Sequence, residues 1–269
     1  MTLTRTQVTA LLASHGLTPS KALGQHFLID PNTARRIARL AGVGPSDRVL
    51  EVGPGLGSLT LALLETGAEV TAVEVDPRLA AVVAEVTGGR CEVVVGDARD
   101  VDLSVLGEGP VQVVANLPYN VAVPIVVRLL EAAPAVRALL VMVQTEVAER
   151  LAAPPGSRTY GAVTVKVDYF ASARVVGRVP RSVFLPEPNV DSSLVALTRR
   201  DAVAVDPNAV SEERLFEVVR AAFAHRRKML RRSLDGVVAP AAFARAGVDP
   251  TQRPEELDVL AFGRLAATP

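Results

Sequence analysis

The sequence predicts a doubly wound α/β domain followed by a small helical domain. From about residue 47 onward, short β-branched runs alternate with helical stretches, which is typical of parallel strands joined by crossover helices. This alternation stops near residue 202, and residues 209–269 show helical patterns only. We therefore expect an α/β domain over residues 1–201 and a helical domain over residues 202–269.

The strands expected in the first domain are apolar along almost their whole length. Such runs are typical of parallel strands whose two faces are both covered by helices. The expected strands are Arg48–Val52, Glu69–Val75, Glu92–Gly96, Val111–Ala115 and Ala138–Gln144. The expected helices between them are Ser58–Thr66, Pro77–Val86 and Ala122–Ala132.

The segments around this sheet are predicted from their composition. A basic helical stretch, Pro31–Leu40, precedes the first strand. Two further apolar runs, Val163–Val176 and Ser192–Leu197, follow the last one and are separated by the proline-rich segment Val179–Pro188. Polar residues and a proline within Arg199–Asn208 indicate a linker. In the helical domain the clearest expected helix is 212–234.

Composition excludes several classes of protein. The chain has 269 residues, 49% of them hydrophobic and 22% charged, with 29 basic and 29 acidic residues. The apolar content excludes a disordered protein, and the zero net charge argues against a protein that binds nucleic acid indiscriminately. The chain also lacks the run of about 18 apolar residues that a membrane span needs. The N-terminus shows no secretory signal, so we expect a cytoplasmic protein. One cysteine, Cys91, and three histidines are too few for a disulfide or an ordinary zinc site, so we expect no metal.

A glycine-rich loop lies directly between the first expected strand and helix. In the segment Glu51-Val-Gly-Pro-Gly-Leu-Gly57, Gly53, Gly55 and Gly57 allow a sharp turn and a close approach to a ligand. The third glycine comes one residue earlier than in the nicotinamide fingerprint. The spacing resembles the E/D-x-G-x-G-x-G loop of S-adenosylmethionine-dependent methyltransferases, although a plain glycine-rich turn stays open as an alternative.

Two carboxylates end the next two strands. Glu74, in Val73-Glu-Val-Asp76, is placed to accept the ribose hydroxyls of a nucleoside, and Val75 adjoins it. Asp97, followed by Ala98, is placed to accept an adenine amino group. Taken alone, each carboxylate is also explained by a solvated strand end or a helix cap.

The most specific motif is Asn116-Leu-Pro-Tyr119, at the end of the fourth expected strand. An adenine N6 amine is a poor nucleophile, because its lone pair is delocalised into the ring. The side-chain oxygen of Asn116 and the carbonyl of Leu117, presented by the fixed φ of Pro118, are suitable acceptors for its hydrogens. Tyr119 offers a face on which an extruded base can stack.

These motifs together resemble the rRNA adenine N6-dimethyltransferases, and specifically their small-subunit branch. The segment Leu23-Gly-Gln-His-Phe-Leu28 is similar to the family's N-terminal LGQNFL cofactor segment, which implies cofactor contacts for Gln25, His26 and Leu28. His26 stands where the family usually has asparagine. The segment Gln144–Leu151 and the loop Val183-Phe-Leu-Pro-Glu-Pro188 also match, and the family uses the residue at Phe184 as the second stacking face for the target adenine.

The resemblance implies an enzyme with a Rossmann-like methyltransferase domain and S-adenosylmethionine as its cofactor. It implies that Asn116 contributes to cofactor binding as well as to catalysis. The implied reaction is transfer of methyl groups to N6 of two adjacent adenines in a hairpin near the 3′ end of small-subunit (16S) rRNA, each of which becomes dimethylated. The implied partner is the maturing small ribosomal subunit, and we expect the enzyme to act as a monomer.

Two basic segments are candidates for contact with the RNA phosphates. The segment 220–232 holds six basic residues and no acidic one, and we expect it to form a basic-faced helix, although a solvated helix face is also possible. The expected RNA-binding residues are Arg35, Arg36, Arg226, Arg227, Lys228 and Arg231. The loop Pro154–Tyr160, rich in proline, glycine and serine, is where we expect mobility.

Three other functions are weighed against this one. The macrolide-resistance branch of the same superfamily dimethylates one adenine of large-subunit rRNA, and its members more often carry an N-I-P-[FY] string. A catalytically idle ribosome assembly factor would keep the fold without the chemistry, and the complete cofactor loop and Asn116 disfavour it. A nicotinamide oxidoreductase is disfavoured by the spacing of the glycines.

Overall fold

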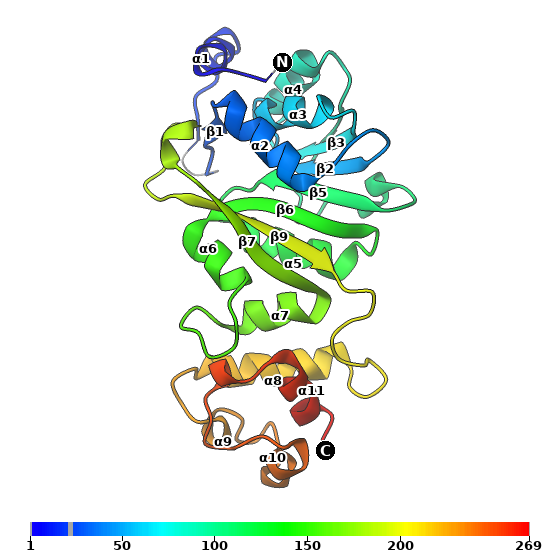
Figure 1. Cartoon of the computed structure of the whole chain (residues 1–269), viewed down its shortest axis with the longest axis vertical. Helices are drawn as coiled ribbons and strands as arrows, with labels where there is room; N and C mark the ends of the chain where they lie inside the picture. Colours follow the sequence, from blue (N-terminus) through cyan, green and yellow to red (C-terminus); the bar gives the residue numbers. More distant parts are fainter. Residues whose placement is uncertain (1, 21–23, 269) are drawn as a thin grey trace. The chain divides into compact units, whose positions relative to one another are not determined.

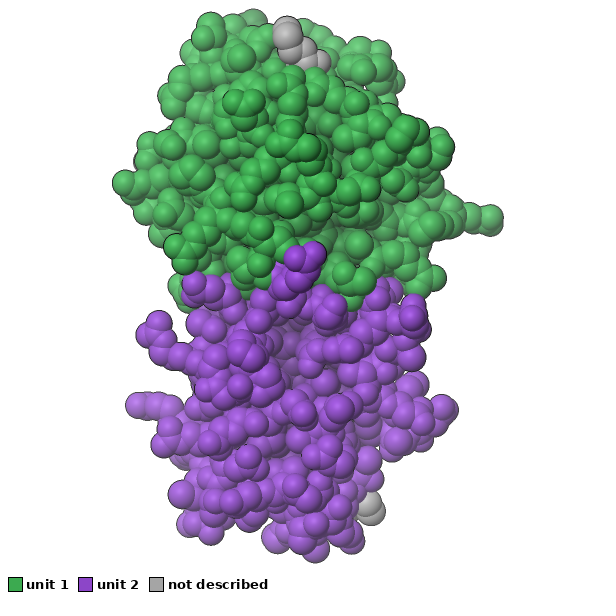
Figure 2. Space-filling view, in the orientation of Figure 1, with its two compact units in different colours: residues 1–148, 175–198 green, residues 149–174, 199–269 purple. Residues whose placement is uncertain are grey.

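The computed structural model describes residues 2–20 and 24–268 (Figure 1). These residues fall into two compact units, coloured separately in Figure 2. The first unit comprises residues 1–148 and 175–198, and the second comprises residues 149–174 and 199–269. Part of the chain that the sequence assigns to the first domain therefore packs with the C-terminal helices. Whether the units are independent domains with a boundary near residue 202 stays a prediction.

A seven-stranded mixed sheet with strand order β4-β3-β2-β5-β6-β9-β7 forms the centre of the fold. Strands β2 to β6 run parallel where they pair, and β9 pairs antiparallel with β6. The strands are β2 (Arg48–Val52), β3 (Glu69–Glu74), β4 (Glu92–Val95), β5 (Val111–Asn116), β6 (Val136–Gln144), β7 (Ala171–Val179) and β9 (Ser192–Arg199). The predicted doubly wound class is confirmed, and the five expected strands all form.

The helices α1 to α5 and their connecting turns belong to the first unit. They are α1 (Arg5–Ser14), α2 (Pro31–Ala41), α3 (Ser58–Leu64), α4 (Pro77–Thr87), the 3₁₀ turn η1 (Leu103–Leu106) and α5 (Ala122–Ala132). Helix α2 shows why the boundaries lie where they do. Asp30 caps it by accepting a hydrogen bond from the Thr33 amide, Pro31 occupies its first turn, and Gly42 ends it with a left-handed φ of 69°.

One core face of the first unit lies between the sheet and helices α2 and α3. Buried residues of these helices, such as Ile37 and Leu63, form one cluster with Val49, Val114 and Leu140 of the strands. A second cluster joins α1 to the pocket side of the fold, because Val8 and Leu12 pack with Phe27 and Leu56. The first cluster thus holds α2 and α3 against the sheet, and the second holds α1 against the N-terminal segment and the glycine loop.

A separate two-stranded sheet connects the N-terminal segment to a distant loop. Strand β1 (Phe27–Leu28) pairs antiparallel with β8 (Phe184–Leu185), so that Phe27 lies opposite Leu185 and Leu28 opposite Phe184. The Ile29 amide adds a hydrogen bond of 2.9 Å to the Val183 carbonyl, within the 3₁₀ turn η2 (Arg181–Val183). The segment that the sequence assigns to the cofactor is thereby attached to the proline-rich loop.

The second unit is built from short helices. They are α7 (Ala162–Phe170), α8 (Glu212–Ala224), α9 (Leu230–Ser233), α10 (Pro240–Ala246), the 3₁₀ turn η3 (Pro254–Glu256) and α11 (Val259–Ala266), while α6 (Thr145–Leu151) contributes residues to both units. Rings of Tyr169, Phe170 and Phe216 meet edge to face in its core.

The expectation of one helix over 212–234 is wrong. Helix α8 ends at Ala224 and a turn follows, in which the Lys228 amide donates to the His225 carbonyl at 2.8 Å. The amides of Leu230 and Arg231 then donate to the carbonyls of Gln252 and Pro250 instead of continuing a helical ladder. Long-range backbone contacts therefore decide against one continuous helix, and within the basic segment residues 225–229 form a turn between α8 and α9.

Candidate active site

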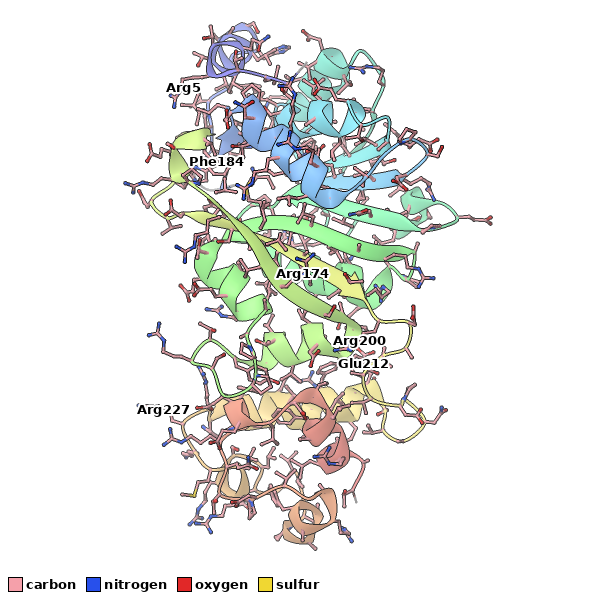
Figure 3. The ribbon with its side chains drawn as sticks, in the orientation of Figure 1. Arg5, Arg174, Phe184, Arg200, Glu212 and Arg227 are labelled. Carbon is pink, nitrogen blue, oxygen red and sulfur yellow. The ribbon has the colours of Figure 1, made fainter. Side chains whose placement is uncertain are left out.

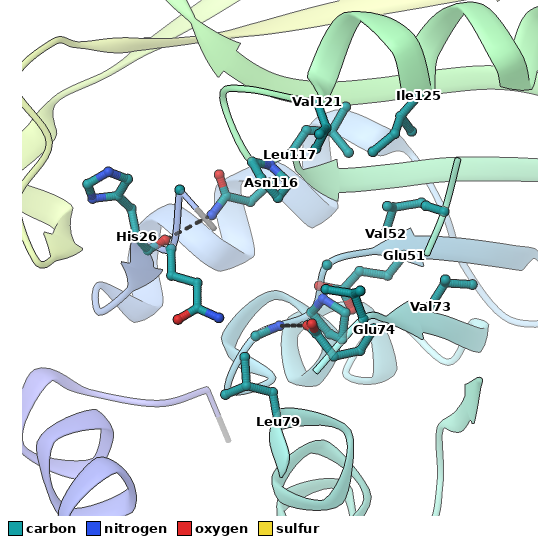
Figure 4. A pocket seen from close by; sticks show the side chains of 18 of the residues that line it. His26, Glu51, Val52, Val73, Glu74, Leu79, Asn116, Leu117, Val121 and Ile125 are labelled. Atoms are coloured by element: carbon teal, nitrogen blue, oxygen red, sulfur yellow. Dashed lines mark hydrogen bonds between the residues drawn. The ribbon is translucent and has the colours of Figure 1, made fainter. Parts of the chain in front are cut away.

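A pocket opens at the carboxyl ends of the parallel strands, where β2 and β5 lie side by side and the strand order reverses (Figure 4). Ligands bind at this position in doubly wound sheets, because the loops on its two sides diverge. The cavity has a volume of about 260 Å³, close to the lower end of the range for small-molecule sites, about 300 Å³. Apolar side chains of Val52, Leu79, Val121 and Ile125 form part of its wall.

The glycine loop between β2 and α3 lines this pocket with backbone. Gly53 and Gly55 have φ values of 69° and 60°, in the left-handed region that favours glycine. A Cβ at Gly55 would lie 3.0 Å from the Phe27 ring. Gly57 does not line the pocket; its missing Cβ leaves room for Val86 of α4, at 2.9 Å. The first two glycines thus shape the site, and the third lets α3 and α4 pack.

Glu74 lies at the end of β3, with its side chain buried next to the glycine loop. Its Oε2 accepts a hydrogen bond of 3.1 Å from the Gly55 amide, and its Oε1 accepts one of 3.1 Å from the Asp76 amide. Burial raises the pKa of Glu74 above its usual value, while these amide donors lower it. Each oxygen keeps further acceptor capacity, so the carboxylate can accept the hydroxyls of a ribose.

Glu51, at the carboxyl end of β2, is the most deeply buried carboxyl group of the pocket. It is 1% exposed, and its Oε2 has no hydrogen-bond partner among the described residues. Burial raises the pKa of Glu51 to about 8, and the charge of Glu74 adds to the shift. A cation next to Glu51 would stabilise its carboxylate, and S-adenosylmethionine carries an ammonium and a sulfonium. The residues present therefore fit this cofactor.

Asp97 follows β4 and lies at the pocket with Ala98 and Arg99. The side chain of Arg99 donates to both carboxylate oxygens of Asp97, and these hydrogen bonds lower the pKa of Asp97. Val75, also at the rim, is 51% exposed and offers an apolar surface. The sequence prediction placed Asp97, Ala98 and Val75 here but did not find Arg99, since a charged residue in a loop carries no local signal.

The N-terminal segment forms the opposite wall of the pocket. Gln25, His26 and Leu28 all line it, whereas Leu23 of the same motif lies outside the described residues. The Gln25 side-chain oxygen accepts a hydrogen bond from the Ser20 amide at 2.8 Å, which closes a local turn. His26 Nδ1 lies 2.7 Å from the Pro186 carbonyl; because a carbonyl only accepts, the ring carries a proton on Nδ1.

Asn116, the last residue of β5, is oriented by this N-terminal segment. Its Nδ2 donates to the His26 backbone carbonyl at 3.2 Å, which turns Oδ1 away from that carbonyl (Figure 4). The Leu117 amide donates to the Met142 carbonyl of β6 at 3.1 Å, so the chain after Asn116 is anchored to the sheet. The hydrogen bond to the His26 carbonyl orients the amide of Asn116, and the role of its oxygen as an acceptor for the target adenine stays a prediction.

Tyr119 contacts the imidazole of His26. The two ring centroids lie 5.4 Å apart with an angle of 27° between the planes. The Tyr119 hydroxyl is hydrogen-bonded to Ser192 Oγ at 2.8 Å, and burial raises the pKa of Tyr119. His26 thus touches the residue that is predicted to stack on the target base, a contact that the family's asparagine has no ring to make.

Phe184, expected as the second stacking face, does not line the pocket. It is 1% exposed and packs in the core cluster with Leu28 and Ile37. In this conformation the ring that faces Tyr119 is that of His26, and the role of Phe184 with RNA stays a prediction. The β1–β8 pairing explains its burial, because Phe184 lies opposite Leu28.

The basic residues expected to bind RNA differ in whether their side chains already form ion pairs or hydrogen bonds within the protein. In the first unit, Arg35 pairs with Glu65 at 2.8 Å, and Arg36 donates to the Arg178 carbonyl at 3.0 Å. In the second unit, Arg226 donates to the carbonyls of Ser157 and Arg158, at 3.4 and 2.6 Å.

Arg227, Lys228 and Arg231 are exposed, and Arg227 projects from the turn after α8 (Figure 3).

No group of three or more potential metal ligands occurs among the residues described, and no described helix is long and apolar enough to cross a membrane.

Comparisons with known proteins agree with this geometry. The family model described as ribosomal RNA adenine dimethylase matches residues 17–265. The chain is 51% identical to the ribosomal RNA small subunit methyltransferase A of Thermobifida fusca, over 98% of this chain and 95% of the relative. It is 52% identical to the protein of the same name from Kineococcus radiotolerans, over 93% and 85% of the two chains.

Solved structures of two rRNA-modifying or adenosine-modifying enzymes share the fold. The 23S rRNA methyltransferase ErmE superposes with a TM-score of 0.69 at 32% identity, covering 89% of this chain and 99% of that one. A dimethyladenosine transferase from Plasmodium falciparum superposes with a TM-score of 0.73 at 26% identity, covering 89% and 96%.

Proposed function

The chain belongs to the ribosomal RNA adenine dimethylase family, and on this premise we propose that it dimethylates N6 of two adjacent adenines near the 3′ end of small-subunit rRNA. It is an S-adenosylmethionine-dependent adenine dimethyltransferase. The observation that supports the small subunit as substrate is the identity of 51% and 52% to proteins named for that subunit, along nearly the whole chain. The large-subunit enzyme ErmE is 32% identical.

The cofactor supplies a methyl group already activated by the sulfonium. Glu74 and Asp97 would hold the ribose hydroxyls and the adenine amine at one end of the pocket, and Glu51 would face the cationic part. None of these carboxylates is needed as a base toward the substrate. The N6 proton can leave to water after transfer, because a methylated adeninium amine is strongly acidic.

Asn116 acts on the target adenine. Its Nδ2 is held by the His26 carbonyl, so Oδ1 can accept a hydrogen from N6 and stabilise the positive charge that develops there. The Leu117 carbonyl is the second acceptor that we propose, and Tyr119 holds the base by stacking. Alignment of the amine and these acceptors together account for catalysis without a covalent nucleophile.

The setting of the enzyme follows from its substrate. We propose that it acts as a monomer in the cytoplasm on the maturing small subunit, where a folded RNA–protein surface supplies the contacts that a near-neutral protein needs. We propose no metal in the reaction, because the sulfonium needs no Lewis acid to activate it. The exposed Arg227, Lys228 and Arg231 are the residues that we assign to phosphate contact.

Methyl transfer to purified ribosomal subunits tests the proposed function. Small and large subunits that lack their adenine dimethylations are incubated with the protein and labelled S-adenosylmethionine, and primer extension locates the blocked bases. Label on two neighbouring adenines of the small subunit is the expected result. Label on a single adenine of the large subunit would assign the protein to the resistance type instead. Cofactor binding without label on either subunit would identify an idle assembly factor.

A further inference from the structure

The guanidinium of Arg99 lies on the carboxylate that is expected to recognise the cofactor's adenine. Arg99 Nε lies 3.0 Å from both oxygens of Asp97, and its terminal nitrogen lies 2.5 Å from Oδ2. The Arg99 backbone amide also donates to Oδ1 at 2.8 Å. Both residues line the same pocket.

These contacts engage most of the acceptor sites of Asp97. A carboxylate has about four lone-pair positions, two on each oxygen. The single hydrogen on Arg99 Nε is shared between Oδ1 and Oδ2, while the Arg99 amide donates to Oδ1 and the terminal nitrogen donates to Oδ2. An adenine amine that donates to Asp97 therefore competes with the Arg99 guanidinium for the carboxylate.

The loop around Asp97 stays in place without the Arg99 side chain. Arg128 of α5 donates to the carbonyls of Ala98 and Val101, at 2.9 and 2.7 Å. The amides of Asp100 and Val101 donate to the Asp97 carbonyl, at 2.9 and 2.7 Å. Arg128 also adds positive charge near Asp97, which favours the carboxylate form. Release of Arg99 thus frees an acceptor on a loop that is already fixed.

We propose that Arg99 is a gate for the adenine end of the cofactor: its guanidinium engages both oxygens of Asp97 in the free protein and gives way when the adenine amine binds. This inference rests on the proposed function only in taking S-adenosylmethionine as the cofactor. The half-exposed Arg99 side chain, 52% accessible, can move into solvent at little cost. Competition from Arg99 lowers the affinity for the cofactor, and this effect occurs only for ligands whose base carries an amine that donates to Asp97.

The chain contains a matched control for this arrangement. Asp76 and Arg78 form the same local pair, with the Arg78 amide, Nε and terminal nitrogen donating to Asp76 at 2.9, 3.1 and 2.8 Å. Neither residue lines the pocket. Loss of Arg78 therefore reproduces the electrostatic change of losing Arg99 without opening an adenine acceptor.

Calorimetric titration of the purified full chain, without RNA, tests the gate. The probes are S-adenosylhomocysteine and its analogue with purine in place of adenine, which lacks the amine. Arg99→Ala, and Arg99→Met as a variant that keeps the aliphatic stem, are expected to bind S-adenosylhomocysteine about two- to fivefold more tightly, the range expected for loss of one exposed ion pair. Affinity for the purine analogue is expected to stay unchanged, and Arg78→Ala is expected to change neither affinity.

Other outcomes would overturn the gate. Unchanged or weaker binding of S-adenosylhomocysteine by both Arg99 variants would show that Arg99 does not compete with the amine. An equal gain for both probes, or the same gain in Arg78→Ala, would assign the effect to overall charge. Because no RNA is present, these results are independent of which ribosomal subunit is methylated.

Discussion

At the scale of single residues, the pocket combines carboxylates in contrasting environments. Glu51 is buried with an unpaired oxygen, Glu74 is buried but accepts two backbone amides, and Asp97 is partly exposed and paired with Arg99. Burial raises the pKa of the first two, while the ion pair lowers that of the third. The adenosine end and the cationic end of the cofactor would thus meet different electrostatics in the proposed arrangement.

Glu51 is expected to make the cofactor-free protein less stable as the pH rises. Its pKa is about 8 in the folded protein against an ordinary value of 4.5, so between these two values the folded state binds one proton more than the unfolded state. The stabilisation that comes from protonated Glu51 is complete below pH 4.5. It is lost progressively up to about pH 8, and over this range the free energy of unfolding falls by at most about 1.4 kcal/mol per pH unit. Urea unfolding across this range should show the decline in the wild type and a flatter profile in Glu51→Gln.

Glu65→Gln is the control for this experiment. The pKa of Glu65 is lowered to about 2 by its hydrogen bond with Arg35, so above about pH 5.5 this carboxyl is ionised in both the folded and the unfolded state. Its replacement should leave the slope of the wild type intact. An equal slope in Glu51→Gln and the wild type would show that Glu51 is not the group responsible.

Asn116→Ala is expected to lower kcat about a hundredfold or more, because an acceptor for the charge developing on N6 is lost. The affinity for S-adenosylhomocysteine should fall far less than kcat, because Asn116 is only one of many residues that line the pocket. Single-turnover methyl transfer and calorimetry measure the two effects separately. The exposed Asn32 of α2 provides a control, since Asn32→Ala should alter neither quantity. Turnover near that of the wild type in Asn116→Ala would contradict the assigned role.

At the scale of elements, connections between distant segments complete the site. The glycine loop, the β3 and β4 ends and the β5 motif come from consecutive α/β units, and their place follows from the parallel sheet. The wall formed by β1 depends instead on β8, which is more than 150 residues away in the sequence. Helix α1, which the sequence analysis missed, packs behind this wall; the Thr4–Gln7 capping box was the signal for it.

Gly55→Ala is expected to weaken cofactor binding about tenfold or more. The new Cβ would approach the Phe27 ring to 3.0 Å and would sit at a left-handed φ of 60°, which costs a non-glycine residue about 1 kcal/mol. Displacement of Phe27 would disturb the neighbouring cofactor segment. Calorimetry with S-adenosylhomocysteine measures the loss.

Gly16→Ala separates the two causes. Gly16 has nearly the same φ, 59°, and a Cβ there would meet nothing within 4 Å. This variant should lose only the stability that a left-handed φ costs a non-glycine residue, and it should bind the cofactor as the wild type does. Equal affinity in Gly55→Ala would show that the loop has room for a side chain.

Much of the fold and the site could be predicted from the sequence, because both rest on local patterns. Apolar runs in the sequence predict the five parallel strands. The polar residues at or just after the ends of these strands are Glu51, Glu74, Asp97 and Asn116. Three features could not be predicted in this way. The break after Ala224 depends on backbone contacts with 250–252, the burial of Phe184 depends on pairing with β1, and the Arg99–Asp97 pair depends on side-chain geometry within a loop.

At the scale of the whole molecule, the proposed cofactor pocket and the residues proposed for RNA contact lie in different units. The residues described at the cofactor pocket all belong to the first unit, and the exposed basic turn Arg227–Lys228 belongs to the second. Arg226 is engaged in the second unit, where it holds the loop that contains Ser157 and Arg158. The expected mobility of residues 154–160 is opposed by this arginine and by the Gly156 amide, which donates to the Glu255 carbonyl at 2.6 Å.

The double variant Arg227→Ala/Lys228→Ala is expected to bind the small subunit more weakly. Two phosphate contacts would be lost, so the slope of log affinity against log salt should become shallower by about two. Binding to the subunit at several salt concentrations measures this slope. Arg226→Ala provides the contrast, because its main expected effect is faster proteolysis within residues 154–160. An unchanged slope in the double variant would place the RNA contacts elsewhere.

The β1–β8 pairing also has a consequence for the order in which the protein matures during its own synthesis. The segment with Gln25 and His26 leaves the ribosome early, but its partners Phe184 and Leu185 and the Pro186 carbonyl follow only after about two thirds of the chain has been made. A nascent chain that ends before β8 has the glycine loop and the Asn116 motif without this wall. The enzyme therefore gains its complete methyl-donor pocket late in translation.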